Sequence, residues 1–230
     1  MKLPSRHLPL AALALVAGVA GVVAANLSAR GPDGAASGAP GAAADEEALR
    51  AVQARLENTL VLPEGFRTVP AFSLVGTDGG PIDEGFLEGR WTLAFFGFTH
   101  CPDVCPITLQ VMKRVVAELE SRSVEPMQVA FFTVDPSRDT AERMRDYVAF
   151  FDEDFVGVTG EVADVHALTS ALGIVASFTA NESDPEAYGV DHTASMLLID
   201  PALRVRAKFN PPHESESIVA DYLTLMAELN

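Results

Sequence analysis

One stretch decides the fold of this chain: Thr92-Leu-Ala-Phe-Phe-Gly-Phe-Thr-His-Cys101-Pro-Asp-Val-Cys105-Pro-Ile-Thr108. Its beginning, Trp91–Phe98, is a short apolar run that predicts a central strand with both faces covered. Apolar residues then recur at helical spacing and predict a helix over Pro106–Arg122, with a proline suited to the first turn. The only two cysteines, Cys101 and Cys105, therefore lie at a helix N-terminus, where backbone N–H groups favour thiolate.

These two thiols allow three interpretations. A structural disulfide is the first, although a bridge across so short a loop restricts the unfolded chain little. The second is a redox pair that forms and breaks a disulfide. The third is a soft-metal site, because two thiolates from one turn can bind an ion such as Cu(I). Three intervening residues, rather than the two of the common Cys-x-x-Cys redox motif, favour the metal, and a third ligand elsewhere would strengthen that interpretation.

Three motifs occur in order along the chain. They are Gly97-Phe-Thr-His-Cys-Pro-Asp-Val-Cys-Pro106, Val134-Asp-Pro-Ser-Arg-Asp-Thr140, and Val190-Asp-His-Thr-Ala-Ser195 with Leu198-Ile-Asp-Pro201 after it. Together they resemble the SCO/SenC family, which are copper-binding, thioredoxin-fold assembly factors for cytochrome c oxidase. The resemblance spans about Phe66–Leu229.

The resemblance implies a copper chaperone. Cys101, Cys105 and His192 would bind one copper ion and deliver it to the binuclear copper centre of cytochrome c oxidase. Two thiolates and one imidazole suit Cu(I) and can also hold Cu(II). In a thioredoxin-type sheet the loop that carries His192 faces the cysteine helix, where redox enzymes place a cis-proline, and this sequence has a histidine there instead.

A thiol–disulfide oxidoreductase is the alternative function. In that case Cys101 and Cys105 would form a redox disulfide that reduces the recipient's cysteines, and the protein would be an enzyme rather than a chaperone. The partners implied by the resemblance are the copper-bearing subunit of the oxidase, a periplasmic thiol reductant and a second copper chaperone as donor. Copper titration of the wild type against a His192 variant separates the two functions.

Four further polar residues have possible supporting roles around the thiols and the imidazole. His100 adjoins Cys101, while Asp103 and Asp191 flank the cysteines and His192, where a carboxylate can orient an imidazole. Asp135 follows a strand on the side where open α/β sheets place their sites, and we expect it to hydrogen-bond near the metal loop or to aid docking. Exposed loop charge is the plainer interpretation of Asp103 and Asp191.

The N-terminal region predicts a membrane anchor. A basic flank, residues 1–7, precedes the uncharged stretch Leu8–Leu27, whose 20 residues can span a bilayer as a single transmembrane helix. A cleaved secretory signal is the alternative. Residues 28–45 are rich in Gly, Ala, Pro and Ser and read as a flexible linker. The flank would stay in the cytoplasm of a bacterium and residues 46–230 would face the periplasm, either on the inner membrane or secreted.

The charge of the chain excludes one class of partner. Its formal net charge is −16, and nearly all of the acidic residues follow the linker. So acidic a surface repels phosphate groups, which argues against binding to nucleic acid or to an anionic membrane surface.

The remaining patterns predict strands that alternate with helices and hence an α/β sheet covered on both faces. This order matches a thioredoxin-like domain, residues 46–230, with an N-terminal β-hairpin extension and an insertion around Thr179–Gly189. The expected elements are a helix over Glu46–Asn58, a hairpin over Phe72–Ile82 turning at Asp78-Gly79, strands over Met127–Val134 and Val156–Val158, a helix over Thr140–Phe151 with Asp139 as N-cap, a helix from Val162 closed by Gly173, a hairpin of Ser195–Ile199 with Arg204–Phe209, and a final helix around Ile218–Met226.

Overall fold

The computed structural model describes residues 40–229 apart from residues 126, 182, 183, 185 and 186. The compact unit Asp45–Asn230 contains all of the strands found in these residues. The predicted basic flank (1–7), the predicted anchor or signal (8–27) and residues 28–39 of the predicted linker lie outside the described residues. Within the described part, none of the helices combines the length and the apolar character needed to cross a membrane.

A mixed eight-stranded sheet forms the centre of the unit Asp45–Asn230. Its strands are β1 (Thr59–Val61), β2 (Ser73–Gly76), β3 (Pro81–Asp83), β4 (Thr92–Gly97), β5 (Gln128–Thr133), β6 (Val156–Thr159), β9 (Met196–Ile199) and β10 (Val205–Phe209). They are ordered β1-β10-β9-β4-β5-β6-β2-β3. The β4–β5 and β5–β6 pairs are parallel and all the other pairs are antiparallel. The strands β7 (Ala176–Thr179) and β8 (Gly189–His192) form a separate two-stranded antiparallel sheet.

The strand β4 is central and completely buried, as its unbroken apolar sequence predicts. All six of its residues are buried, and it lies between β5 and β9. Aromatic rings stack across its border with β5: the Phe95 and Phe131 ring centroids are 5.8 Å apart, and those of Phe96 and Phe132 are 5.1 Å apart. Because β4 is fixed on both faces and both edges, the cysteine loop that follows it starts from a rigid position.

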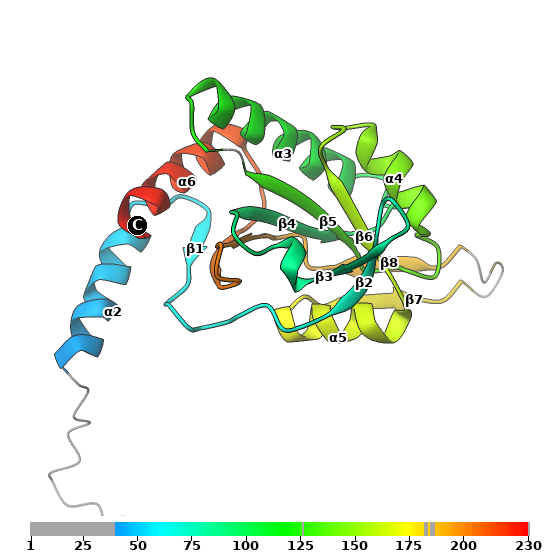
Figure 1. Cartoon of the computed structure of the whole chain (residues 1–230), viewed down its shortest axis with the longest axis horizontal. Helices are drawn as coiled ribbons and strands as arrows, with labels where there is room; N and C mark the ends of the chain where they lie inside the picture. Colours follow the sequence, from blue (N-terminus) through cyan, green and yellow to red (C-terminus); the bar gives the residue numbers. More distant parts are fainter. Residues whose placement is uncertain (1–39, 126, 182–183, 185–186, 230) are drawn as a thin grey trace, which may run out of the picture. The chain divides into compact units, whose positions relative to one another are not determined.

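Helices pack on both sides of this sheet. The helices of the described residues are α2 (Pro40–Gln53), α3 (Val104–Ser121), α4 (Ala141–Ala149), α5 (Val162–Leu172) and α6 (Ser215–Leu229), with a short 3₁₀ turn η2 (Glu84–Phe86). Figure 1 shows α3 and α6 side by side along one side of the sheet and α5 along the other. The predicted α/β architecture is therefore confirmed.

Two local predictions are also confirmed. The hairpin of β2 and β3 turns at Asp78-Gly79, where Gly79 has a φ of 79° and the Asp78 carboxylate accepts a hydrogen bond from the Gly80 N–H. The helix α5 ends at Gly173, which has a φ of 72°. Both glycines adopt the left-handed conformation that other residues avoid.

The first helix differs from its prediction. It begins at Pro40, within the region expected to be a flexible linker, and it ends at Gln53 although the apolar spacing extended it to Asn58. Alanines have the highest helix propensity, which explains the early start. The helix ends at Gln53 because the side chain of this residue joins it to β1. This side chain donates a hydrogen bond to the Thr59 carbonyl and accepts one from the Val61 N–H.

The prediction of Asp139 as the N-cap of α4 is wrong. Thr140 is the N-cap, and its hydroxyl accepts a hydrogen bond from the Arg143 N–H. Threonine and aspartate are both common N-caps, so the sequence offered two neighbouring candidates. The Asp139 side chain is instead fully buried and accepts hydrogen bonds from other segments.

The region before His192 also differs. His192 was expected in a loop, but it is the last residue of β8, and β7 was not predicted. The reason is physical: three of the four residues of β7 are exposed, so the strand lacks the alternation of apolar and polar residues that would reveal it.

Replacing Gly97 should destabilise the domain. An added Cβ atom at Gly97 would lie 2.7 Å from Cys105 Sγ and 2.8 Å from Phe131 Cε2, so Gly97→Ala forces β4 and α3 apart. We expect unfolding by urea to show a loss of about 1–3 kcal/mol, the usual cost of overpacking. Gly189→Ala is the matched control, because its Cβ would meet nothing closer than 3.8 Å. Equal stability of the two variants would contradict this tight packing.

Candidate metal centre

Three side chains with metal-binding atoms converge at one end of the sheet. Ligand atoms of Cys101, Cys105 and His192 all lie within 4.8 Å of one another. Cys101 lies in the loop after β4, Cys105 in the first turn of α3, and His192 at the end of β8, 87 residues beyond Cys105. The structure thus brings together the three residues that the sequence predicted as ligands.

The helix start orients the two thiols. They are not joined by a disulfide, and Cys105 is fully buried while Cys101 is 9% exposed. The Cys105 backbone N–H donates a hydrogen bond to Cys101 Sγ at 3.4 Å. A negatively charged sulfur is favoured there because N–H groups at the start of α3 are not used within the helix.

The two thiols differ sharply in acidity. The pKa of Cys101 is lowered to about 5, mainly by a hydrogen bond from the Cys105 thiol and also by the backbone N–H groups of Asp103 and Cys105, against the opposing effect of burial. The same hydrogen bond, together with burial, raises the pKa of Cys105. At neutral pH the pair therefore holds one proton, on Cys105, and one negative charge, on Cys101.

His192 presents a nitrogen lone pair to the thiols. Its Nδ1 lies 3.0 Å from the Thr193 carbonyl oxygen, which can only accept, so Nδ1 carries the ring proton. The other nitrogen, Nε2, lies 3.4 Å from Cys105 Sγ. The ring is half-buried and packs edge-on against Phe95 and Phe98, with centroid distances of 6.1 and 5.7 Å. A histidine held in this tautomer and orientation is suited to bind a metal through Nε2.

The other predicted site residues lie around this group of three, and none belongs to it. Asp103 and Asp191 are exposed, and the Asp103 side chain does not cap α3. His100 is exposed, with Nδ1 at 3.7 Å from the Asp139 carboxylate. Asp135 is only 1% exposed, and its carboxylate accepts hydrogen bonds from Arg138 and Tyr188.

Several polar residues that hold the site together were not predicted. Asp139 accepts hydrogen bonds from the Thr99 N–H at 3.0 Å, from the Thr99 hydroxyl at 2.5 Å and from the Thr133 hydroxyl at 2.7 Å. Asp135 accepts from Arg138 Nε at 2.6 Å and from the Tyr188 hydroxyl at 2.5 Å. The sequence did single out the segment Val134–Thr140, but its spacing alone did not show which residues these carboxylates would meet.

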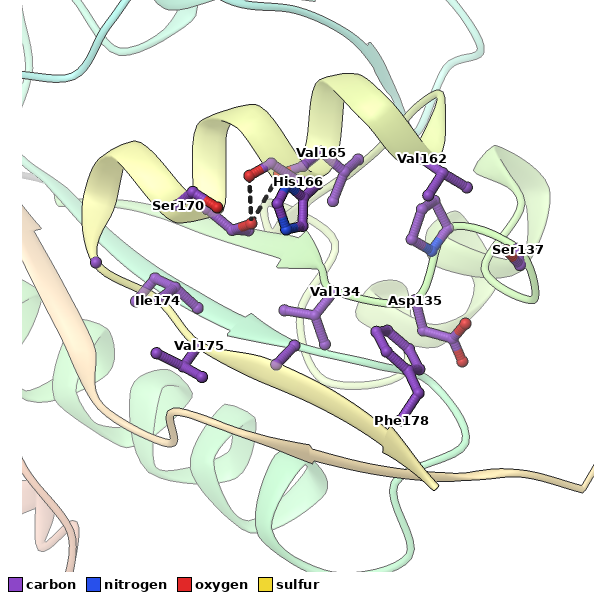
Figure 2. A pocket seen from close by; sticks show the side chains of 14 residues that line it. Val134, Asp135, Ser137, Val162, Val165, His166, Ser170, Ile174, Val175 and Phe178 are labelled. Carbon is purple, nitrogen blue, oxygen red and sulfur yellow. Dashed lines mark hydrogen bonds between the residues drawn. The ribbon is translucent and has the colours of Figure 1, made fainter. Parts of the chain in front are cut away.

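A pocket lies beside Asp135 and does not contain this centre. It has a volume of about 360 Å³ and lies between α5, β7 and the turn after β5. Figure 2 shows Asp135 and Phe178 at one end of the pocket and Ile174 and Val175 at the other. Cys101, Cys105 and His192 are not among its lining residues, so the three ligand atoms sit outside this cavity.

The fold and the three residues define a metal-binding α/β domain, and comparison with known proteins identifies its family. The family model described as SCO1/SenC matches residues 62–227, which is most of the chain. The chain belongs to the SCO1/SenC family.

Individual relatives agree with this assignment. A Stutzerimonas stutzeri protein whose name refers to copper binding is 36% identical over 67% of this chain and 74% of its own length. The human mitochondrial SCO1 homologue is 42% identical over 56% of this chain, which spans only 43% of that protein. The crystal structure of Arabidopsis thaliana ScoI with copper bound has a TM-score of 0.65 and 29% identity, covering 71% of this chain and 99% of that one. Its agreement confirms a mixed α/β fold of the thioredoxin-like Sco type.

The acidity of the two thiols can be tested by alkylation. A lowered pKa keeps Cys101 ionised as the pH falls, so its reaction with iodoacetamide should remain fast from pH 9 to pH 7 and fall by half near pH 5. Cys105 should stay unmodified in the folded protein because its pKa is raised. Mass spectrometry of the two sites measures this, with protein unfolded in urea as control. A midpoint near 9 for Cys101 in the folded protein would contradict the hydrogen-bonded pair.

Proposed function

We propose that this protein is a copper chaperone that binds one copper ion through Cys101, Cys105 and His192. One observation carries the proposal: two sulfur atoms from the loop and first turn at the start of α3 and one imidazole nitrogen from the end of β8 lie within 4.8 Å of one another. Two thiolates and an imidazole suit Cu(I) and can also hold Cu(II). Membership of the SCO1/SenC family and the copper-bound Arabidopsis relative support copper over other soft metals.

The residues of the site have distinct tasks in this proposal. Cys101 is already a thiolate at neutral pH, whereas Cys105 must lose its proton, so metal binding releases about one proton. His192 offers Nε2 while the Thr193 carbonyl fixes its ring. Cys105 is fully buried, so an incoming thiolate reaches the ion from the side of Cys101 and His192. Ligand exchange from that side would pass copper on without releasing it.

We propose the copper-bearing subunit of cytochrome c oxidase as the recipient. The human and Arabidopsis relatives support this, since they are named as SCO1 homologues and the family resemblance implies a role in oxidase assembly. A recipient that supplies its own thiolates fits an exchange of ligands. A second copper chaperone as donor and a thiol reductant complete the proposed partners, because an oxidising compartment would otherwise convert both thiols to a disulfide.

A thiol–disulfide oxidoreductase is the second candidate function, and the acidity of Cys101 favours it. The Cys101 thiolate would attack one sulfur of a disulfide in the recipient, forming a mixed disulfide and releasing the other sulfur as a thiolate. Cys105 would then lose its proton and attack Cys101 Sγ. The products are a Cys101–Cys105 disulfide and a recipient with both cysteines reduced, so two electrons pass to the recipient. His192 is not needed for this reaction.

For localisation we propose a single-pass anchor at Leu8–Leu27, with the copper-binding domain in the bacterial periplasm. The length of the stretch, its lack of charge and the basic flank before it support this. Intact-mass measurement of membrane-derived protein should give the full chain. A mature chain that begins near Ser28 or Ala29 would contradict the anchor and favour a cleaved signal.

Removing His192 separates the two candidate functions. His192→Ala should weaken copper binding, Cu(II) above all, by more than the roughly 10–100-fold that loss of an outer hydrogen-bond partner costs. The stability cost should be on the order of 1 kcal/mol because the side chain is only half-buried. Competition titration with a copper chelator measures the affinity, and oxidase activity of cells carrying the variant measures assembly.

The cysteine variants complete this experiment. Cys101→Ser and Cys105→Ser should abolish tight copper binding and assembly together. Protein with the cysteines oxidised to a disulfide should likewise fail to bind, since the ligands are then consumed. Full assembly by His192→Ala, with none by the cysteine variants, would refute the chaperone and support the oxidoreductase.

A further inference from the structure

The ligands come from two parts of the fold that the main sheet does not join. The cysteines follow β4, the central strand. His192 ends β8, which pairs only with β7 among the described residues and is outside the eight-stranded sheet. Backbone hydrogen bonds of the main sheet fix the cysteine half directly, whereas they reach the histidine half only through β9, which pairs with β4 and begins at Met196, after the end of β8. The start of β8 must be held at ligand distance by other contacts.

We propose that the turn Asp135-Pro-Ser-Arg-Asp139 positions the two halves of the site against each other. Asp139 fixes the loop that leads to Cys101, and Asp135 with Arg138 fixes Tyr188, the residue immediately before β8. The proposal rests on the proposed copper site and assigns these three residues a positioning role in it. None of them touches the metal-binding atoms directly.

The cysteine half depends on Asp139. Its carboxylate is fully buried and accepts hydrogen bonds from both the N–H and the hydroxyl of Thr99, two residues before Cys101. It also accepts a hydrogen bond from the hydroxyl of Thr133 at the end of β5. Arg143 Nε donates to the same Thr99 hydroxyl at 2.7 Å. A buried charge with three donors is held in one geometry, because any displacement would leave it without compensation.

The histidine half depends on Asp135 and Arg138. Asp135 is itself tied to β5, because its N–H donates to the Thr133 hydroxyl at 2.9 Å. Tyr188 is then held in three ways: its hydroxyl donates to Asp135 Oδ1, its carbonyl accepts from Arg138 Nη1 at 3.2 Å, and its ring stacks under the Arg138 guanidinium at 3.7 Å. Tyr188 is four residues from His192 along an extended strand, so fixing it fixes the direction of β8.

Thr133 joins the two halves at one point. Its hydroxyl donates a hydrogen bond to the Asp139 carboxylate and accepts one from the Asp135 N–H. Both aspartates are therefore bonded to the same end of β5. The turn also shapes one end of the neighbouring pocket, where Figure 2 shows Asp135 beside Phe178 of β7. The position of the imidazole relative to the thiols thus follows from hydrogen bonds made by a segment that supplies no ligand.

Two conservative variants test the halves separately. Tyr188→Phe removes only the hydroxyl bound to Asp135, and Tyr147→Phe is its control because the structure gives the Tyr147 hydroxyl no hydrogen bond among the described residues. Thr99→Val removes the hydroxyl bound to Asp139, and Thr99→Ser retains it. Circular dichroism and thermal unfolding establish that each variant folds. Arg138→Lys, which keeps the charge but loses the stacked guanidinium, is the second variant of the histidine half.

The expected results differ between the halves. Tyr188→Phe and Arg138→Lys should weaken Cu(II) binding by about 10–100-fold. They should also reduce the nitrogen hyperfine splitting in the electron paramagnetic resonance spectrum. The reduction potential of the Cys101–Cys105 pair should stay unchanged in both variants. Thr99→Val should shift that potential, and Thr99→Ser should restore it. A role in stability alone would not produce this separation.

Three outcomes would overturn the proposal. The first is Tyr188→Phe behaving like Tyr147→Phe in copper affinity and spectrum. The second is both histidine-half variants binding copper as the wild type does. The third is every variant changing both readouts together, which would show a general loss of stability. Failure of the proposed function is a different result, since wild-type protein would then bind no copper or bind it equally well without His192.

Discussion

The burial of β4 on both faces is the constraint on which the site depends. Its six residues are all inaccessible to water, so the strand has one position in the sheet and the chain leaves it at one place. Cys101 and Cys105 follow within eight residues of that exit, the second of them already in a helix. Gly97 shows how tight the junction is, because the chain there has no room for a single methyl group. A rigid exit gives the thiols a defined separation before any metal arrives.

Close packing also explains the unequal chemistry of the two cysteines. Cys105 is fully buried and its pKa is raised, whereas Cys101 keeps 9% of its surface exposed and its pKa is lowered to about 5. This arrangement is compatible with a metal, which takes both sulfurs as thiolates, and with a disulfide, whose exchange needs one reactive thiolate. The imidazole adds a nitrogen directed at the sulfurs, which a metal ion can use as its third ligand.

Sequence reasoning succeeded where a pattern is local. The apolar run of β4, the helical spacing of α3, the Asp78-Gly79 turn and the end of α5 at Gly173 each follow from a few neighbouring residues. The family resemblance pointed to His192, which no spacing rule would have selected. Asp139 was misassigned as a cap because its true partner, Thr99, lies 40 residues away. Tyr188 and Arg138 were missed for the same reason. They are far apart in the sequence, and the residues next to them form no pattern that predicts their contact.

The small sheet of β7 and β8 has a consequence for the order in which parts of the molecule open. Protein segments unfold locally at very different free energies, and those with few backbone partners and exposed side chains open first. β7 is largely exposed, and β8 pairs with one strand among those that the structure describes, whereas β4 has two neighbours and no exposed residue. Amide hydrogens of β8 therefore exchange with solvent before those of β4. Local opening of β8 would break the contacts of Tyr188 and move the imidazole while both sulfurs stay in place, so a bound ion would lose one ligand without the core of the domain coming apart.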